Sequence, residues 1–297
     1  MKRFTSPRLL RWLLTPIAIF AFMLLMDSCL QFRMSRSEID QYFVDKPSKG
    51  ILKQYAVGKR TITYLKAGLE DKPLIVFIHG SPGSLSAFID YLADSTLLAH
   101  ALLISVDRPG FGASDFGYAE PSLEKQAALL KPILEEHKNN RPILLVGHSL
   151  GGPLIARMAI DYPELVDGLI MVAPSIAPEL EPNEWFRAPL ATPFLKWLLP
   201  RSIRASNDEI YQLKPELEEL IPLWKTITTP TMVIQGTKDS LVDPGNAAFA
   251  EKMMVNAPVK IQFLEGIDHF IPWSHPETIR AAALLLLESQ AMATINK

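Results

Sequence analysis

From residue 51 onward, short apolar runs alternate with longer mixed segments. Residues 51–57 and 60–65, separated by Gly58-Lys59, predict two strands joined by a turn. Five later runs are wholly or almost wholly apolar, which is typical of strands buried on both faces of a sheet. These runs are Leu74–Ile78, Leu102–Val106 and residues 143–146, 169–172 and 231–234. A further strand is expected at Val259–Leu264.

Helical segments are predicted between these strands. They are Leu123–Glu136 and residues 150–162, 247–254 and 274–290. Ser274 followed by Glu277, with Pro276 in the first turn, indicates a capping box at the start of the last helix. The alternation of strands and helices predicts an α/β fold with a mostly parallel sheet and helices on both faces.

Residues 176–228 interrupt this alternation. They are rich in proline, contain no clear strand and include several candidate helices. We expect them to form a helical cap inserted between two core strands, not a separate domain. The cap carries Trp185, Trp197 and Trp224, which either contact an apolar substrate or pack the cap onto the core.

Length, charge and cysteine content narrow the functional classes. The 297 residues suit one large α/β domain, and a net charge of −2 with interspersed signs argues against a nucleic-acid partner. A single cysteine excludes an intrachain disulfide and a cysteine-based zinc site. No metal-binding spacing such as HExxH occurs among the six histidines. We therefore expect no metal and no other cofactor.

The N-terminus has the layout of a secretory signal. Basic residues in the first 12 positions precede an almost wholly apolar stretch at residues 13–26. This stretch is short for a membrane-spanning helix, which needs about 20 apolar residues. Its end, Ser28-Cys29, resembles the lipidation site of bacterial lipoproteins, although Met26 and Asp27 depart from that pattern. The alternative is an uncleaved signal anchor in which Cys29 only fills apolar space.

The sequence thus predicts three regions. Residues 1–34 are expected to be a signal peptide or membrane anchor, residues 35–50 a polar tether, and residues 51–297 the α/β domain with its cap. The protein is then expected at a membrane, facing outside the cytoplasm.

The segment Gly-His-Ser-Leu-Gly at residues 147–151 lies between a predicted buried strand and a predicted helix. A nucleophile elbow needs this setting, because its serine occupies a strained turn that points the hydroxyl out above the sheet. Glycine before and after Ser149 avoids collisions with the neighbouring strand and helix. The sequence therefore predicts Ser149 as a nucleophile, with a simple turn serine as the alternative.

The segment His-Gly-Ser-Pro-Gly at residues 79–83 follows the strand Leu74–Ile78. Acyl transfer builds negative charge on an oxygen, which fixed N–H groups must stabilise. The backbone N–H groups of Ser81 and Leu150 are the candidates for this oxyanion hole, since Pro82 has no N–H to donate. A Gly/Pro turn that closes a strand is the alternative.

With two further motifs, the chain resembles the α/β-hydrolase fold-1 family over roughly residues 51–288. These motifs are Asp-Arg-Pro-Gly-Phe-Gly-Ala-Ser at residues 107–114 and Asp-Tyr-Pro-Glu at residues 161–164. In that family the serine, the acid and the histidine follow in this order along the chain. The resemblance assigns the acid to Asp239 and the general base to His269. Asp243 and His275 are rivals, but each lies at a predicted helix start, and capping explains its surroundings.

These roles imply a serine hydrolase. His269 would take the proton of Ser149 as the hydroxyl attacks a carbonyl, and Asp239 would orient His269. The resulting acyl-enzyme would be released by water. A small apolar ester is the broadest expected substrate class. A carbon–carbon bond hydrolase, an amidase or peptidase, and a binding protein of this fold without catalysis are the alternatives.

Overall fold

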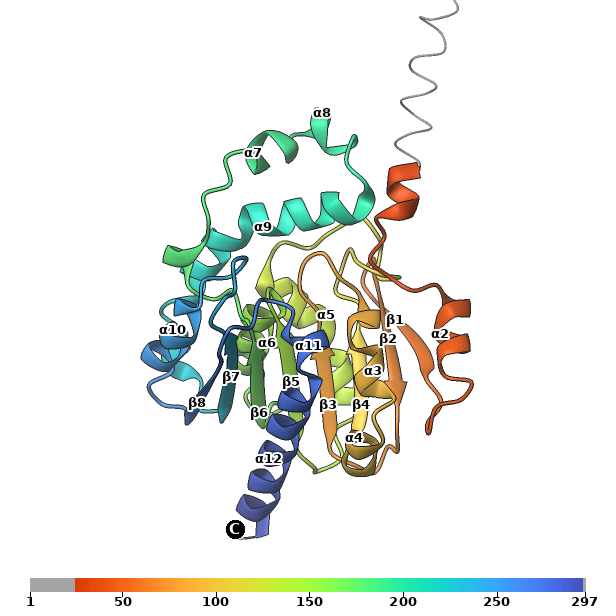
Figure 1. Ribbon diagram of the computed structural model, residues 1–297, viewed down its shortest axis with the longest axis vertical. Coiled ribbons are helices and arrows are strands. Elements are labelled where there is room, and N and C mark those ends of the chain that lie inside the picture. Colours follow the sequence, from red (N-terminus) through yellow and green to blue (C-terminus); the bar gives the residue numbers. More distant parts are fainter. Residues whose placement is uncertain (1–24, 296–297) are drawn as a thin grey trace, which may run out of the picture.

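The computed structural model of the protein describes residues 25–295, and its centre is an eight-stranded sheet (Figure 1). The strand order is β1-β2-β4-β3-β5-β6-β7-β8. The strands β1 and β2 pair antiparallel, β2 pairs antiparallel with β4, and all remaining pairs are parallel. The strands are β1 Ile51–Val57, β2 Arg60–Ala67, β3 Leu74–Ile78, β4 Leu102–Val106, β5 Ile143–His148, β6 Gly168–Val172, β7 Thr231–Gly236 and β8 Val259–Leu264.

Helices cover both faces of this sheet (Figure 1). One face is covered by α5 (Leu123–Glu136), α6 (Gly151–Asp161) and α10 (Gly245–Met253). The other face is covered by α2 (Arg36–Tyr42), α3 (Ile89–Leu92), α4 (Ser95–His100), α11 (Ile271–Ser274) and α12 (Pro276–Ile295). The predicted α/β fold with a mostly parallel sheet is therefore confirmed.

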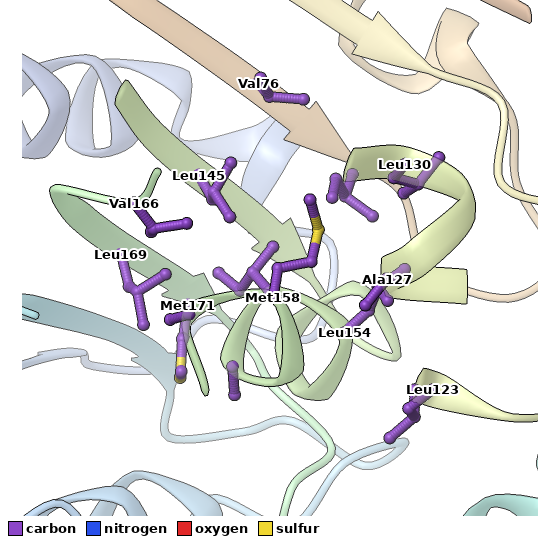
Figure 2. Packing of buried hydrophobic residues seen from close by; sticks show 14 of the residues in the cluster. Val76, Leu123, Ala127, Leu130, Leu145, Leu154, Met158, Val166, Leu169 and Met171 are labelled. Carbon is purple, nitrogen blue, oxygen red and sulfur yellow. The ribbon is translucent and has the colours of Figure 1, made fainter. Parts of the chain in front are cut away.

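Strand β5 shows why the central runs are continuously apolar. Leu145 joins the core on the α5–α6 side, whereas its neighbours Leu144 and Val146 join the core on the α12 side. Successive side chains point to opposite faces of a strand, so burial of both faces favours apolar residues at successive positions. Figure 2 shows Leu145 among side chains from the sheet and from α6, including Leu154 and Met158.

The last helix begins differently from the prediction. Ser274 ends α11, and its hydroxyl donates a hydrogen bond to the Phe270 carbonyl at 3.0 Å. Helix α12 begins at Pro276, with Glu277 in its first turn. The predicted capping box of Ser274 and Glu277 is therefore wrong, because a short separate helix uses the serine at its own end.

Residues 35–50 also differ from the expected polar tether. Ser35 caps α2, and its hydroxyl and the Glu38 carboxylate form a capping box there. Ile39 and Phe43 are buried in the core on the α12 side of the sheet. This segment therefore packs as part of the folded domain.

The predicted signal or anchor falls mainly on residues 1–24, which lie outside the described residues. Residues 25–29 are helical, and Cys29 is exposed. Of the helices that the structure describes, none is both long and apolar enough to cross a membrane.

The segment that interrupts the sequence pattern lies between β6 and β7, and we call residues 176–228 the cap segment. It contains the short helices α7 (Arg187–Leu190) and α8 (Pro193–Lys196) and the long helix α9 (Arg201–Leu220). Helices α7 and α8 lie beyond α9, on the side away from the sheet (Figure 1).

Substitution of Phe43 by alanine tests whether residues 35–50 contribute to the fold. We expect Phe43→Ala to lower the free energy of unfolding by about 3–5 kcal/mol, because it removes a buried aromatic side chain. The matched control is Val44→Ala, since Val44 is 64% exposed and its loss should change stability by less than about 0.5 kcal/mol. Equal, small effects of both variants in urea unfolding would restore the tether interpretation.

Candidate functional site

Ser149 lies directly after β5 and just before α6, at a sharp reversal of the chain. Its φ is 54°, a left-handed conformation that non-glycine residues seldom adopt. The Ser149 N–H donates to the Val172 carbonyl at the end of β6, at 2.9 Å. The Ser149 carbonyl accepts from the Gly152 N–H at 2.8 Å. Bonds on both sides of the residue therefore hold the strained turn in place.

Glycine is required close to this turn. A Cβ on Gly147 would lie 2.3 Å from the Gly151 carbonyl oxygen, and one on Gly80 would lie 2.8 Å from the Cβ of Ser149. Both distances are shorter than van der Waals contact. Gly147 thus lets β5 and α6 meet, and Gly80 lets the turn after β3 approach Ser149. The structural setting predicted for the elbow is present.

His269 and Asp239 form a buried hydrogen-bonded pair. The His269 Nδ1 lies 2.7 Å from Asp239 Oδ2. Because an ionised carboxylate can only accept, Nδ1 carries the hydrogen and Nε2 of a neutral His269 is left as an acceptor. His269 lies in the loop between β8 and α11, and Asp239 lies in the loop after β7. Both residues are buried.

Asp239 is held in its ionised form. Burial alone would raise its pKa, but hydrogen bonds from His269 and from the backbone N–H groups of Val242 and Leu241 hold the pKa below its usual value. The two N–H groups donate to Oδ1 at 2.8 and 2.9 Å. Gln235 donates to Oδ2 at 3.3 Å. The carboxylate is therefore fixed in position for an interaction with His269.

His148, within the elbow, supports the loop that carries His269. Its Nε2 lies 3.0 Å from the His269 carbonyl oxygen, so Nε2 carries the hydrogen and donates it. The two imidazole rings lie 4.7 Å apart, centroid to centroid. Burial, together with the proximity of His269, lowers the pKa of His148 to about 3. His148 therefore stays neutral near pH 7 and acts as a structural donor.

A cavity of about 400 Å³ brings together four of the predicted site residues. Ser149, His269, Ser81 and Leu150 all contribute to its wall. Asp239 lies behind His269 as its hydrogen-bond partner. The assignment of the Ser81 and Leu150 N–H groups to an oxyanion hole stays a prediction.

The cap segment supplies polar groups to this cavity that the sequence analysis missed. Glu181, Glu184 and Arg187 line it, together with Ser175 just before the cap segment. Burial raises the pKa of Glu181, and a hydrogen bond from the Ser175 hydroxyl partly offsets this effect. Apolar residues such as Ile210 and Leu213 form another part of the wall, so the cavity is lined by both polar and apolar side chains.

The three tryptophans proposed as substrate contacts do not line the cavity of Ser149. Trp224 is fully buried, and its ring packs edge-on against Phe249 of α10. Its assignment to substrate binding is wrong, because the side chain fixes the cap segment to the core. Trp185 and Trp197 are instead exposed to solvent.

The rival residues have structural roles. His275 Nδ1 interacts with the Ser274 hydroxyl at 3.0 Å. Asp243 Oδ1 accepts from the Gly245 N–H at 2.7 Å, within the turn that leads into α10. Among the described residues, no group of three or more His, Cys, Asp or Glu is arranged to hold a metal ion.

A fully buried ion pair joins the cap segment to Arg108, in the loop after β4. Arg108 donates two hydrogen bonds to Glu209 of α9, at 2.7 and 3.0 Å. The same guanidinium donates to the carbonyls of His79 and Gly80, each at 2.9 Å. No local sequence pattern predicts this pair, because it links residues 101 positions apart. Arg108 therefore fixes the backbone that precedes Ser81 and connects it to the cap.

Comparisons with known proteins agree with this architecture. Residues 73–197 match the family model described as alpha/beta hydrolase fold. Over these residues the chain is similar to that family. A monoglyceride lipase homolog from Monkeypox virus is 26% identical over 256 residues, covering 74% of this chain and 86% of that protein. A 2-(acetamidomethylene)succinate hydrolase from Mesorhizobium japonicum is 24% identical, covering 78% of this chain and 93% of that protein.

A solved structure extends the likeness over almost the whole chain. The crystal structure of a membrane phospholipase A, described as a bacterial virulence factor, matches with a TM-score of 0.63 and 20% identity. The match covers 96% of this chain and 99% of that one. At this identity the likeness concerns the fold alone.

The Arg108–Glu209 pair gives a prediction about stability. We expect Glu209→Gln to lower the free energy of unfolding by about 3–5 kcal/mol, because it leaves a buried guanidinium without its counter-charge. The matched control is Asp208→Asn on the same helix as Glu209. It removes a partly exposed ion pair with Lys196 of α8 and should lower the free energy of unfolding by less than about 1 kcal/mol. Equal losses in chemical unfolding would show that the buried pair has no special role.

Proposed function

We propose that the protein is a serine hydrolase of carboxylic esters, with Ser149 as nucleophile, His269 as general base and Asp239 as the residue that orients the base. One observation carries the proposal: a strained elbow serine and a histidine with a buried carboxylate partner line the same cavity. A structural turn serine requires neither the histidine nor the cavity.

The reaction follows from the hydrogen positions. His269 Nε2 accepts the hydroxyl proton of Ser149 while Oγ bonds to the carbonyl carbon of the ester. The N–H groups of Ser81 and Leu150 stabilise the negative charge on the carbonyl oxygen. The imidazolium, paired with Asp239, then gives its proton to the leaving alcohol as the carbon–oxygen bond breaks. Water, activated by His269, releases the acyl group from Ser149.

The cavity supports an ester with an apolar acyl group and a polar remainder. Ile210, Leu213 and Val242 provide apolar wall, whereas Glu181 and Arg187 provide polar wall. The names of two similar proteins, a monoglyceride lipase homolog and a membrane phospholipase A, agree with lipid-type esters. Amide and carbon–carbon bond substrates are the alternative, and the name of the hydrolase from Mesorhizobium japonicum, whose substrate carries an acetamido group, agrees only with the amide.

Membrane attachment through residues 1–34, facing outside the cytoplasm, is proposed on the sequence alone. The basic and apolar stretches support it, and lipidation of Cys29 or an uncleaved anchor would each provide it. Full-length protein that stays with membranes after alkaline extraction would agree with this proposal. Full-length protein that is recovered freely soluble would contradict it.

Hydrolysis of p-nitrophenyl acetate, butyrate and octanoate tests the proposed activity. We expect wild-type turnover, with kcat/KM higher for octanoate than for acetate because of the apolar wall. Ser149→Ala and His269→Ala should each lower kcat by about a thousandfold or more, since each removes a group that acts in the transition state.

The matched control is His275→Ala, which removes the neighbouring histidine outside the cavity and should stay within about threefold of wild type. If folded Ser149→Ala retained more than about a tenth of the wild-type rate, Ser149 would not be the nucleophile. No turnover of any ester by folded wild-type protein would favour an amide or carbon–carbon substrate, or a binding function.

A further inference from the structure

Four large aromatic side chains of the cap segment are exposed on one short stretch around α7 and α8. They are Trp185, Phe186, Phe194 and Trp197, with exposed fractions of 79%, 39%, 77% and 57%. We call these four residues the aromatic face. Helices α7 and α8 lie at the outer end of the molecule, beyond α9 (Figure 1). Exposing this much aromatic surface to water serves no packing role in the fold, so the face suits contact with a partner.

The start of the described chain is fixed at the same end of the molecule. Asp27 accepts hydrogen bonds from the Arg201 backbone N–H at 2.7 Å and from its Nε at 2.9 Å. The Ser202 hydroxyl donates to the Leu30 carbonyl. Arg201 and Ser202 form the first turn of α9. Residues 27–30 therefore adjoin the cap segment, as Figure 1 shows.

A stacked cluster strengthens this connection. The guanidinium groups of Arg33 and Arg201 lie over the ring of Phe116, at 4.2 and 4.8 Å from its centroid. Such contacts hold a cation against an aromatic face. The chain that leads toward the apolar residues 13–26 is thus attached to the helix next to the aromatic face.

We propose that the aromatic face docks on a lipid surface. Tryptophan and phenylalanine are well suited to the membrane–water boundary, where tryptophan in particular combines an apolar ring with a polar N–H. In the sequence, the apolar stretch comes just before the segment fixed to α9, and that segment lies at the same end of the molecule as the aromatic face. A lipid surface can receive both the apolar N-terminal stretch and the aromatic face. A second copy of the chain would account only for the aromatic face.

Docking would also place the cavity beside the membrane. Glu184 and Arg187, which flank Trp185 and Phe186 in the sequence, line the cavity of Ser149. A lipid-derived ester could then enter from the bilayer without crossing water. This last step rests on the proposed esterase function, but docking itself does not, and it is tested without any measurement of hydrolysis.

The test uses the full chain with Cys29→Ser, so that a single introduced cysteine carries an environment-sensitive fluorophore. Phe194→Cys places the label on the aromatic face. The matched control is Lys138→Cys, an exposed site between α5 and β5, at the opposite end of β5 from Ser149. Vesicles of phosphatidylcholine and phosphatidylglycerol contain nitroxide-labelled acyl chains as the quencher. Hydrogen exchange of residues 185–197 in the unmodified chain, with and without vesicles, provides a second measurement.

We expect vesicles to quench the label at residue 194 and to shift its emission to the blue, while the label at residue 138 stays unchanged. Exchange at residues 185–197 should slow. Quenching of neither label, or equal quenching of both, would overturn the proposal, because the first shows no lipid contact and the second shows no preferred face. Protection of residue 194 without vesicles, increasing with protein concentration, would assign the face to a second copy and would equally overturn it.

Discussion

The left-handed backbone of Ser149 is the constraint on which the site depends. A φ of 54° in a non-glycine residue costs about 1–3 kcal/mol, so surrounding contacts must maintain it. Hydrogen bonds to β6 and within the turn do so, and glycine at position 147 lets β5 and α6 approach closely enough. Contacts with the sheet therefore hold Ser149 in its strained conformation. Its consequence is that the Ser149 hydroxyl lies past the carboxyl end of the central strand β5, beside the cavity that His269 also lines.

Two buried sets of polar side chains hold the site residues and the cap segment in place. Asp239 fixes His269 from behind, and His148 fixes the His269 backbone from the elbow side. Separately, the Arg108–Glu209 pair holds the turn after β3 and the long cap helix together. Buried charges are tolerated only when they are fully paired. The cap segment is therefore attached to the rest of the domain through this ion pair as well as through the packing of Trp224 against α10.

The central strands and the elbow could be predicted because their causes are local. Strands buried on both faces must be apolar throughout, and the elbow needs small residues at fixed spacing. The helix at Arg36–Tyr42 was missed although Ser35 and Glu38 carried a capping signal, because a polar stretch after an apolar one suggested a tether. The burial of Trp224 and the pairing of Arg108 with Glu209 depend on the tertiary fold. No local pattern distinguishes a buried tryptophan from an exposed one in the cap segment.

The central claim, that Ser149 is an activated nucleophile, is tested most directly by covalent labelling of the full-length protein with a fluorophosphonate. Such a probe reacts with a serine whose hydroxyl is deprotonated by a neighbouring base. Mass spectrometry of the digested adduct identifies the labelled residue. The account predicts a single adduct on the peptide that contains Ser149, absent from folded Ser149→Ala. An adduct on another residue, or no adduct on folded protein, would contradict it.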